Sequence, residues 1–135
     1  MARYAGTNLY ITFKGTAVST DYRELSITRE MGDVEVTAGS DAAATYVNTY
    51  KKGSFKMKLM DQTDGTALSS YKNMMVEGAS GTLIWGEEGT ATGKPKHTIV
   101  IKVDSLEPSL TFDGEATLDI SGKFNATGFV TDGVW

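Results

Sequence analysis

Few side chains in this sequence have the type and spacing that chemistry requires. His97 is the single histidine and the chain has no cysteine, so disulfides, thiolate nucleophiles and a two-histidine metal site are excluded. A lone histidine acts as a general base only beside a positioned nucleophile, and no serine stands in a nucleophile-elbow context. We therefore expect no enzyme activity, and we expect His97 to be a surface residue at a strand end.

Two segments resemble ligand-binding loops only in part. Residues 89–95 have glycines like those of a phosphate-binding loop, but their spacing is one residue short, and Pro95 replaces the metal-binding Ser or Thr. Residues 61–72 begin like a calcium loop, but Lys72 occupies the position of the required bidentate glutamate. The carboxylates at 87–88 are expected to be a solvated loop pair. The sequence therefore predicts no cofactor and no metal.

The bulk composition indicates one globular domain that covers residues 1–135. The net charge of −4 comes entirely from residues 105–135, and an acidic surface disfavours tight binding to phosphate backbones. No secretory signal is visible at the start of the chain, and we expect no membrane span, because the most apolar run, 83–85, is far too short. The 15 glycines and 2 prolines favour short strands joined by tight turns.

Period-two alternation of apolar and polar residues is the main pattern along the chain. One helix is expected at 67–77, capped by Asp64 or Thr66 and ended by Gly78 in a left-handed conformation. Together, the helix and the strands predict a mainly β fold: a β-sandwich or partial barrel of about seven strands, flanked by one short α-helix. The expected strands are 9–13, 22–31, 55–59, 81–85, 98–104, 115–121 and a short one at 129–130.

Residues 32–53 interrupt this pattern and are expected to form a long loop. A structureless loop of this length is uncommon in a compact domain, and such loops are usually functional or ordered by a partner. An ordinary long loop is the alternative. The apolar residues Tyr46, Val47 and Tyr50 have no core partner nearby in the sequence.

Taken together, these elements resemble the tail tube (major tail) proteins of long-tailed bacteriophages. The resemblance rests on the strand 22–31, the segment Asp-Val-Glu-Val-Thr-Ala-Gly-Ser at 33–40, the segment 46–53, the strand 54–59, a helix, and the acidic strand 115–122. It covers essentially the full chain.

The resemblance implies hexameric rings that stack into a hollow tube through which the genome leaves the capsid. One four-stranded sheet of each subunit would line the lumen, and DNA would pass without specific binding. The loop would dock on an adjacent subunit or ring, and aromatic residues suit such an interface. The expected interface residues are Val36, Ala44, Tyr46, Val47, Tyr50 and Trp135. The expected lumen-facing residues are Glu24, Ser26, Thr28, Glu30, Lys56, Lys58, Lys102, Glu115, Thr117 and Asp119.

The resemblance also implies that the protein is made in the host cytoplasm, resides in the virion tail, and meets the tail tip, tape-measure and terminator proteins. Such lumens tend to be acidic, whereas the strand faces here carry nearly balanced charge. Two alternatives stay open. One is a ring-forming tail terminator or head–tail joining protein that does not build a tube. The other is a monomeric β-sandwich module that binds a carbohydrate or receptor through exposed Tyr10, Tyr22 and Trp85.

Overall fold

The computed structural model describes residues 3, 5–40, 42–61, 70–124 and 130–135, without the side chains of residues 49 and 50. The described chain is mainly β, as predicted, with eight strands in one sheet. In chain order the elements are η1 (Gly6–Asn8), β1 (Tyr10–Phe13), β2 (Thr16–Ala17), β3 (Tyr22–Glu35), β4 (Tyr46–Met60), α1 (Tyr71–Met74), β5 (Ser80–Gly86), β6 (Pro95–Ser109), β7 (Thr117–Phe124) and β8 (Thr131–Val134).

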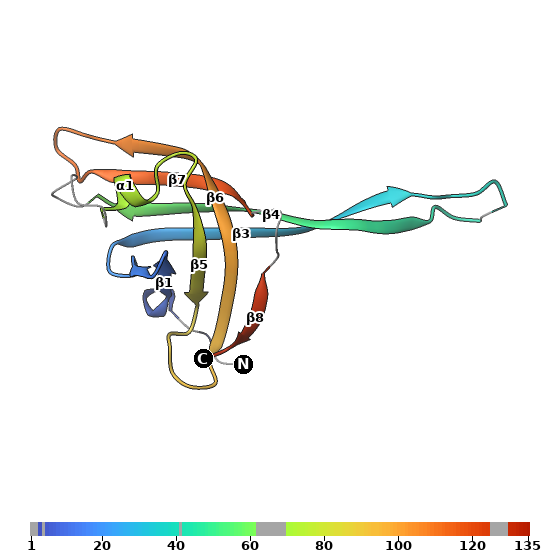
Figure 1. Ribbon diagram of the computed structural model, residues 1–135, viewed down its shortest axis with the longest axis horizontal. Coiled ribbons are helices and arrows are strands. Elements are labelled where there is room, and N and C mark those ends of the chain that lie inside the picture. The colour runs from blue at the N-terminus through green and yellow to red at the C-terminus, as the bar shows by residue number, and fades with distance from the viewer. Residues whose placement is uncertain (1–2, 4, 41, 62–69, 125–129) are drawn as a thin grey trace.

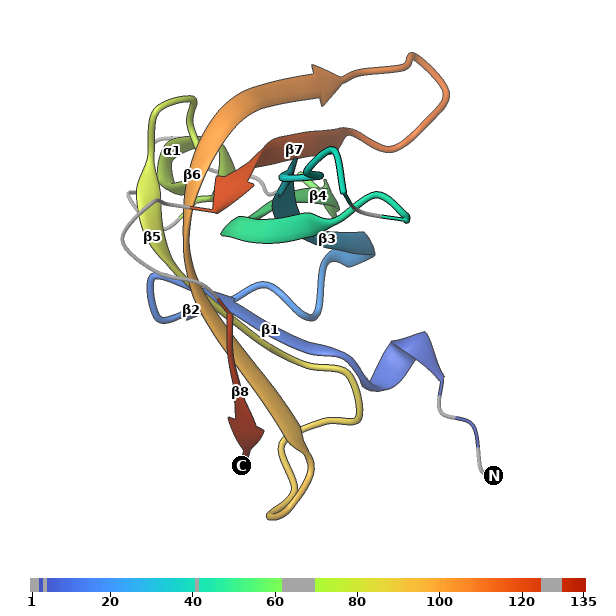
Figure 2. The same cartoon turned by 90° about the vertical axis from the view of Figure 1, so that its right-hand side faces the viewer.

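The sheet is antiparallel throughout and has the order β2-β1-β5-β6-β7-β4-β3, with β8 also paired to β6. The first half of β6 pairs with β5 and β8, whereas its second half pairs with β7. A β-bulge between Val103 and Ser105 separates the two halves, and bulges bend strands. A single sheet therefore folds into two crossing layers with β6 at the corner (Figures 1 and 2).

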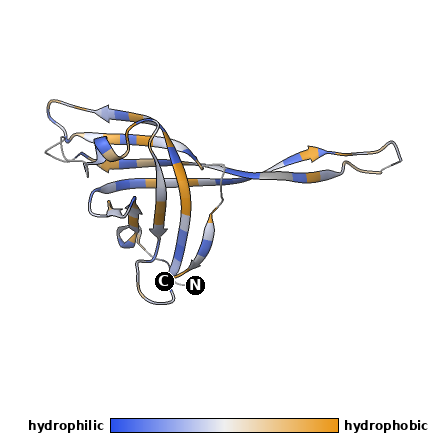
Figure 3. Cartoon of the chain, viewed as in Figure 1, coloured by the Kyte–Doolittle hydropathy of each residue, from blue (hydrophilic) through white to orange (hydrophobic). Residues whose placement is uncertain are grey.

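The core lies between the four-stranded layer (β6, β7, β4, β3) and the short layer (β2, β1, β5, β8 and the start of β6). Alternation decides which side chains enter it: Phe55, Met57 and Leu59 on β4 are buried, whereas the lysines between them are exposed. Figure 3 shows the same alternation of apolar and polar colour along the strands. The other buried apolar residues are Ile11, Phe13, Val18, Tyr71, Met74, Met75, Leu83, Trp85, Ile99, Ile101, Val103, Leu118 and Ile120.

The helix prediction was right in place but not in detail. Within the described residues α1 covers only Tyr71–Met74, and its N-cap is Ser70, which makes no side-chain cap hydrogen bond. The predicted start of the helix and its caps at Asp64 and Thr66 lie outside the described residues. The left-handed conformation predicted for Gly78 is confirmed by its φ of 87°.

The prediction of a long loop at 32–53 was wrong, because most of this segment forms strands. β3 continues to Glu35 and β4 begins at Tyr46, and the two pair with each other. The β-branched residues around Val34 and Val47 favour extended backbone. The pattern was missed because these strands lack a buried face, so no core alternation marks them. The last strand also differs: β8 covers Thr131–Val134, Val130 precedes it, and residue 129 is not described.

Candidate functional site

The most distinctive feature of the molecule is a two-stranded arm (residues 30–52) formed by the ends of β3 and β4. Figure 1 shows it projecting far beyond the two layers. β4 pairs with β7 only from Ser54 onward, so among the described residues the arm strands have only each other as strand partners. Isolated two-stranded hairpins are only marginally stable in water. The arm therefore presents backbone edges and side chains to whatever lies beside the molecule.

One face of the arm is apolar. Val34 lies directly opposite Val47, and Val36 follows on the same face, where its N–H donates to the carbonyl of Thr45 at 2.7 Å. These three valines are 51%, 52% and 49% exposed. Tyr46 lies opposite Glu35 on the other face and is 58% exposed. Exposed apolar side chains gathered on one projection indicate an interaction surface.

The predicted interface residues do not all share this surface. Ala44 lies exposed in the tip of the arm, and Tyr50 belongs to β4, although its side chain is not described. Trp135 instead packs on its own chain: its ring meets Tyr10 edge-on at 5.5 Å, and the Nζ of Lys96 lies 4.9 Å from the ring centre. Its backbone N–H also donates to the carbonyl of Lys94 at 2.9 Å.

The second surface is the solvent-exposed side of the four-stranded layer, which we call the polar face. Register places its side chains in rows across the strands. The first row is Glu24, Lys58, Asp119 and Glu107; the second is Ser26, Lys56, Ser121 and Ser105; the third is Thr28, Ser54, Lys123 and Lys102. Glu30 and Lys52 extend it toward the arm with a 3.8 Å ion pair.

The predicted lumen residues therefore lie together, with one exception. Nine of the ten occupy the polar face, since Thr117 also stands in line with Asp119 on β7. Glu115 precedes β7 and pairs with Arg23 at 3.1 Å. Charges are segregated along the β6–β7 ladder: Asp119 lies opposite Glu107, and Lys123 lies opposite Lys102. A small cleft of about 230 Å³ opens on this face beside Lys56 and Asp119.

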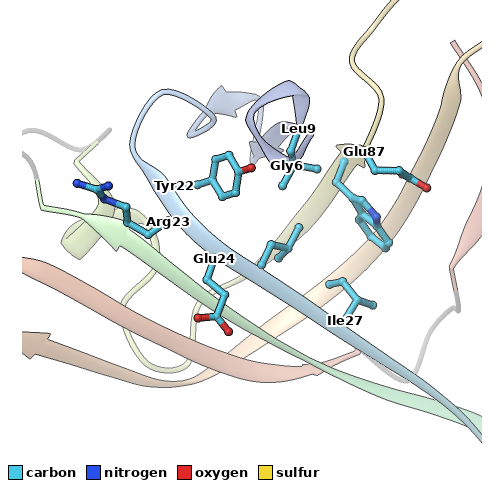
Figure 4. A pocket seen from close by; sticks show the side chains of 9 residues that line it. Gly6, Leu9, Tyr22, Arg23, Glu24, Ile27 and Glu87 are labelled. Atoms are coloured by element: carbon cyan, nitrogen blue, oxygen red, sulfur yellow. The ribbon is translucent and has the colours of Figure 1, made fainter. Parts of the chain in front are cut away.

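A third feature is an apolar groove of about 510 Å³ along β3, which sequence reasoning missed (Figure 4). Leu25 and Ile27 of β3 form one wall, and Leu9 and Trp85 come from the short layer. Tyr22 lies at the start of β3, near Gly6. The groove exists because β3 is the last strand of the sheet, so no further strand of the described chain covers its inward-facing side chains at this edge.

His97 is not the isolated surface residue that the sequence suggested. It is only 16% exposed in its side chain and stacks on Trp85 with ring centres 5.0 Å apart. Its Nδ1 lies 2.6 Å from Asp132 and its Nε2 lies 2.9 Å from Glu87. Glu87 is thus a partner of His97 and not a solvated loop residue. The only sign of this cluster in the sequence was Glu87, ten positions before His97. No pattern indicated that β8 would bring Asp132 to the same place.

The electrostatics of this cluster follow from its contacts. Burial lowers the pKa of His97, but its hydrogen bonds to Glu87 and Asp132 outweigh burial and hold the pKa above its usual value. The guanidinium of Arg29, and then His97, lower the pKa of Asp132. Within the described residues, no group of three or more His, Cys, Asp or Glu side chains is placed to hold a metal ion. The contacts of Asp132 with Arg29 and His97, and of Glu87 with His97, make the cluster a structural clasp between β3, β6, β8 and the β5–β6 loop.

Two further expectations concern exposed aromatics and membranes. Trp85 is only 8% exposed, and Tyr10 and Tyr22 are half-buried, so the stacking platform of a carbohydrate-binding module is not formed. None of the helices in the described part of the chain has the length and apolar character needed to cross a membrane.

Comparisons with known proteins place the fold. No family model and no curated protein matches this chain. A chain in the virion of a native gene transfer agent (GTA) particle matches with a TM-score of 0.75 at 12% identity, covering 98% of this chain and 100% of the other. A chain in the C6-symmetric tail of an empty GTA particle gives 0.72 at 13% identity, with the same coverage. The SPP1 tail tube gives 0.71 at 10% identity and covers 98% of this chain and 80% of the other. The predicted resemblance is thereby confirmed at the level of architecture: this chain has the fold of tail tube proteins.

Proposed function

We propose that this chain is a structural subunit that assembles with copies of itself into stacked, hexameric rings, which form the hollow tail tube of a phage-like particle. The observation that carries this proposal is the four-stranded layer, which ends in two open edges within a fold shared with tail tube chains. The role is mechanical and not catalytic. The assembled protein would reside in the virion tail.

The directions of the strands allow the layer to close into a ring. β6, β7, β4 and β3 alternate in direction, so β3 runs opposite to β6. Rotation about a ring axis preserves strand direction along that axis. β3 of one copy would therefore meet the second half of β6 of the next copy as an antiparallel pair. Closure removes both open edges, which otherwise invite uncontrolled association.

The number of strands agrees with an open bore. Barrels of about 16–18 strands already enclose a water-filled channel. Rings with four strands from each of several copies exceed that size, and the C6 symmetry of the GTA tail supports six copies. The polar face would then line the lumen, with the lumen candidates on the inside.

The arm supplies cohesion in this proposal. Its apolar face, built by Val34, Val36 and Val47, has no core of its own to enter and would dock on an adjacent copy or ring. Ring-to-ring contacts of this kind are heterologous, so they propagate as a filament and do not close. Tyr46 on the opposite face suits the same contact, because aromatic residues are enriched in interfaces.

Passage of DNA would be passive. Acidic and basic side chains are nearly equal in number on the polar face, although they are segregated along the β6–β7 ladder, so the lumen as a whole would have neither a strong attraction nor a strong repulsion for phosphates. Tail tip, tape-measure and terminator proteins would be the partners at the ends of the tube and inside it.

The test is negative-stain electron microscopy of the purified protein over a concentration series. We expect the wild type to form hollow tubes of stacked rings. The variant Val34→Asp should stay monomeric with a nearly unchanged thermal melt, because the side chain of Val34 is already 51% exposed. Deletion of residues 42–48 should have the same result.

The matched control is Val134→Asp, which changes a valine on β8 that is 66% exposed and should leave the tubes intact. Tubes from either arm variant would contradict the role of the arm. Single rings from the wild type would favour a terminator or joining protein, and monomers at every concentration would contradict self-assembly.

A further inference from the structure

Exposed apolar side chains gather at two places in this molecule. Of the nine large apolar side chains that are exposed among the described residues, five lie on the arm and two lie on the β6–β7 turn (residues 110–116). On the turn, Leu110 is 73% exposed and Phe112 is 102% exposed, the largest value of the set. The remaining two, Val76 and Val134, stand outside the four-stranded layer. A phenylalanine buries about 150–250 Å² when it enters a core or interface, so the free turn forgoes a large stabilisation.

The arm and the β6–β7 turn lie at opposite ends of the same four-stranded layer. The turn follows Ser109, which stands in one row with Thr117 and Met60 at one end of the layer. The pairing of β4 with β7 ends at Ser54, at the other end, and β4 continues from there into the arm. Figure 1 shows the turn and the arm at opposite ends of the molecule. Each copy therefore has an exposed apolar feature at both ends of its strands.

Stacking of rings would bring these two ends together. In a ring closed through lateral strand pairing, the strands run along the ring axis with the tilt that is usual for barrels. Rings that stack by rotation and translation keep the same orientation, so the arm end of every ring faces the turn end of the next. The contact is heterologous, which means that two different surfaces of the chain meet and the contact repeats without closing.

The arm is long enough to reach the adjoining ring. At about 3.4 Å per residue, the part of β4 from Ser54 to Met60 spans roughly 20 Å along the strands. Val47 stands a further ~20 Å beyond Ser54, and Val34 lies opposite it on β3. These valines therefore lie about one layer length past the layer to which they belong. At that distance they extend beyond their own ring to the level of the next one.

We propose that the β6–β7 turn of each copy docks on the arm of a copy in the adjoining ring, with Leu110 and Phe112 packing against the exposed valines of the arm. This inference rests on the proposed tube and names the surface that the arm meets there. A second copy of the chain is the occupant because stacking presents one arm to one turn at every ring boundary. The groove along β3 fits less well, since it opens at a lateral edge of the layer, where ring closure would place the neighbour's β6.

Disulfide trapping tests the contact directly, because the chain contains no cysteine. The double variant Asp113→Cys/Thr45→Cys replaces two exposed residues, one beside Phe112 and one opposite Val36, and keeps the apolar side chains of the contact. Its tubes are oxidised and analysed on a denaturing gel. We expect a covalent ladder that runs past the number of copies in one ring, because each bond joins two rings. The control Asp113→Cys/Thr92→Cys carries its second thiol on the exposed β5–β6 loop and should give no ladder.

Assembly of single variants is the second measurement. Phe112→Ser should raise the concentration needed for tubes by at least tenfold, because every ring boundary loses its largest apolar side chain. The thermal melt of the free chain should not change, since Phe112 is fully exposed there. Phe112→Trp keeps an aromatic side chain and should assemble nearly as well as the wild type. The matched control is Val134→Ser on β8, which should assemble at the wild-type concentration.

The outcomes separate this inference from the proposed function. Wild-type tubes with no ladder from the double variant, or with Phe112→Ser assembling at the wild-type concentration, overturn the contact while the tube stands. A ladder that ends at the number of copies in one ring would place the contact within the ring and overturn it as a contact between rings. Absence of tubes from the wild type would refute the proposed function, and this contact with it.

Discussion

Arg29 and Asp132 lie 103 positions apart in the chain and form a two-pronged ion pair, with Nη1 3.1 Å from Oδ1 and Nη2 2.9 Å from Oδ2. Arg29 stands on β3 at the root of the arm, and Asp132 stands on β8 beside His97. Since β3 and β8 belong to different layers, the pair ties the arm root to the short layer. Bidentate pairs fix orientation as well as distance.

Loss of this pair should loosen the arm more than it destabilises the fold. We expect Asp132→Asn to lower the melting temperature only slightly, because both partners are substantially exposed and solvent screens the pair. Amide hydrogen exchange at the arm root should accelerate clearly. The control is Glu115→Gln, which removes the exposed partner of Arg23 at the other end of β3. Equal exchange in both variants would contradict this role for Asp132.

The single histidine predicts a specific dependence of stability on pH. The protonated ring donates from Nδ1 to Asp132 and from Nε2 to Glu87, whereas the neutral ring has only one N–H. The pKa of His97 is raised in the folded state, so its stabilisation is complete below the unfolded value of about 6.5. This contribution is lost as the pH rises through the folded pKa.

We therefore expect the free energy of unfolding to fall above about pH 6.5 in the wild type, and this fall to vanish in His97→Gln. Asp132 acts in the opposite sense: its pKa is lowered, so its contribution is present above about pH 3.9 and is lost on acidification. Urea unfolding over a pH series measures both slopes. Because the chain has one histidine, its imidazole NMR signal reports the folded pKa directly. A folded-state pKa at or below the ordinary value of about 6.5 would refute the clasp.

Gly122 should not tolerate any side chain. A Cβ added there would lie 2.0 Å from the carbonyl oxygen of Lys102 and 2.7 Å from the ring of Phe55. The first neighbour is the backbone of β6 next to its bulge, and it cannot move alone. We expect Gly122→Ala to cost about 3 kcal/mol, at the upper end for overpacking, or to prevent folding. Gly133→Ala meets nothing within 4 Å and should be nearly neutral in the same denaturant titration.

The hydroxyl of Tyr71 anchors the α1 segment to the loop before β3. It donates to Oδ2 of Asp21 at 2.5 Å, and burial, followed by this hydrogen bond, raises the pKa of the phenol. We expect Tyr71→Phe to lower the free energy of unfolding by about 1.5–3 kcal/mol, as for other hydrogen bonds to charged groups. The matched control is Tyr46→Phe on the exposed arm, where no change in stability is expected. Equal melts would show that the bond contributes nothing.

The lysine pair on the polar face predicts a stabilising substitution. Lys123 and Lys102 lie directly opposite each other, and like charges in that position repel. Lys123→Glu should raise stability by about 0.2–1 kcal/mol, and Lys123→Gln by less, with both gains shrinking in high salt. If the polar face lines the tube, Lys123→Glu should also leave tube formation intact, because the side chain points into the bore.

Much of the fold follows from the sequence, because strands with one buried face show apolar and polar residues in alternation. The runs Phe55-Met57-Leu59 and Ile99-Ile101-Val103 alternate with polar residues, and each became a core strand. The left-handed Gly78 and the mainly β class were predicted for similar local reasons. The polar face followed as well, since the exposed side of each strand is fixed once the buried side is known.

Other features depend on contacts between segments that are distant in the sequence, so no local residue pattern predicts them. The arm was read as a loop because neither of its faces is buried, although Val34 and Val47 pair across it. His97 looked solitary because Asp132 reaches it only through the pairing of β8 with β6. Likewise, the β3 groove exists only because the sheet ends there. Sequence determined which residues enter the core, through the periodicity of burial; tertiary structure decided which edges, arms and charges remain for other molecules, through strand order.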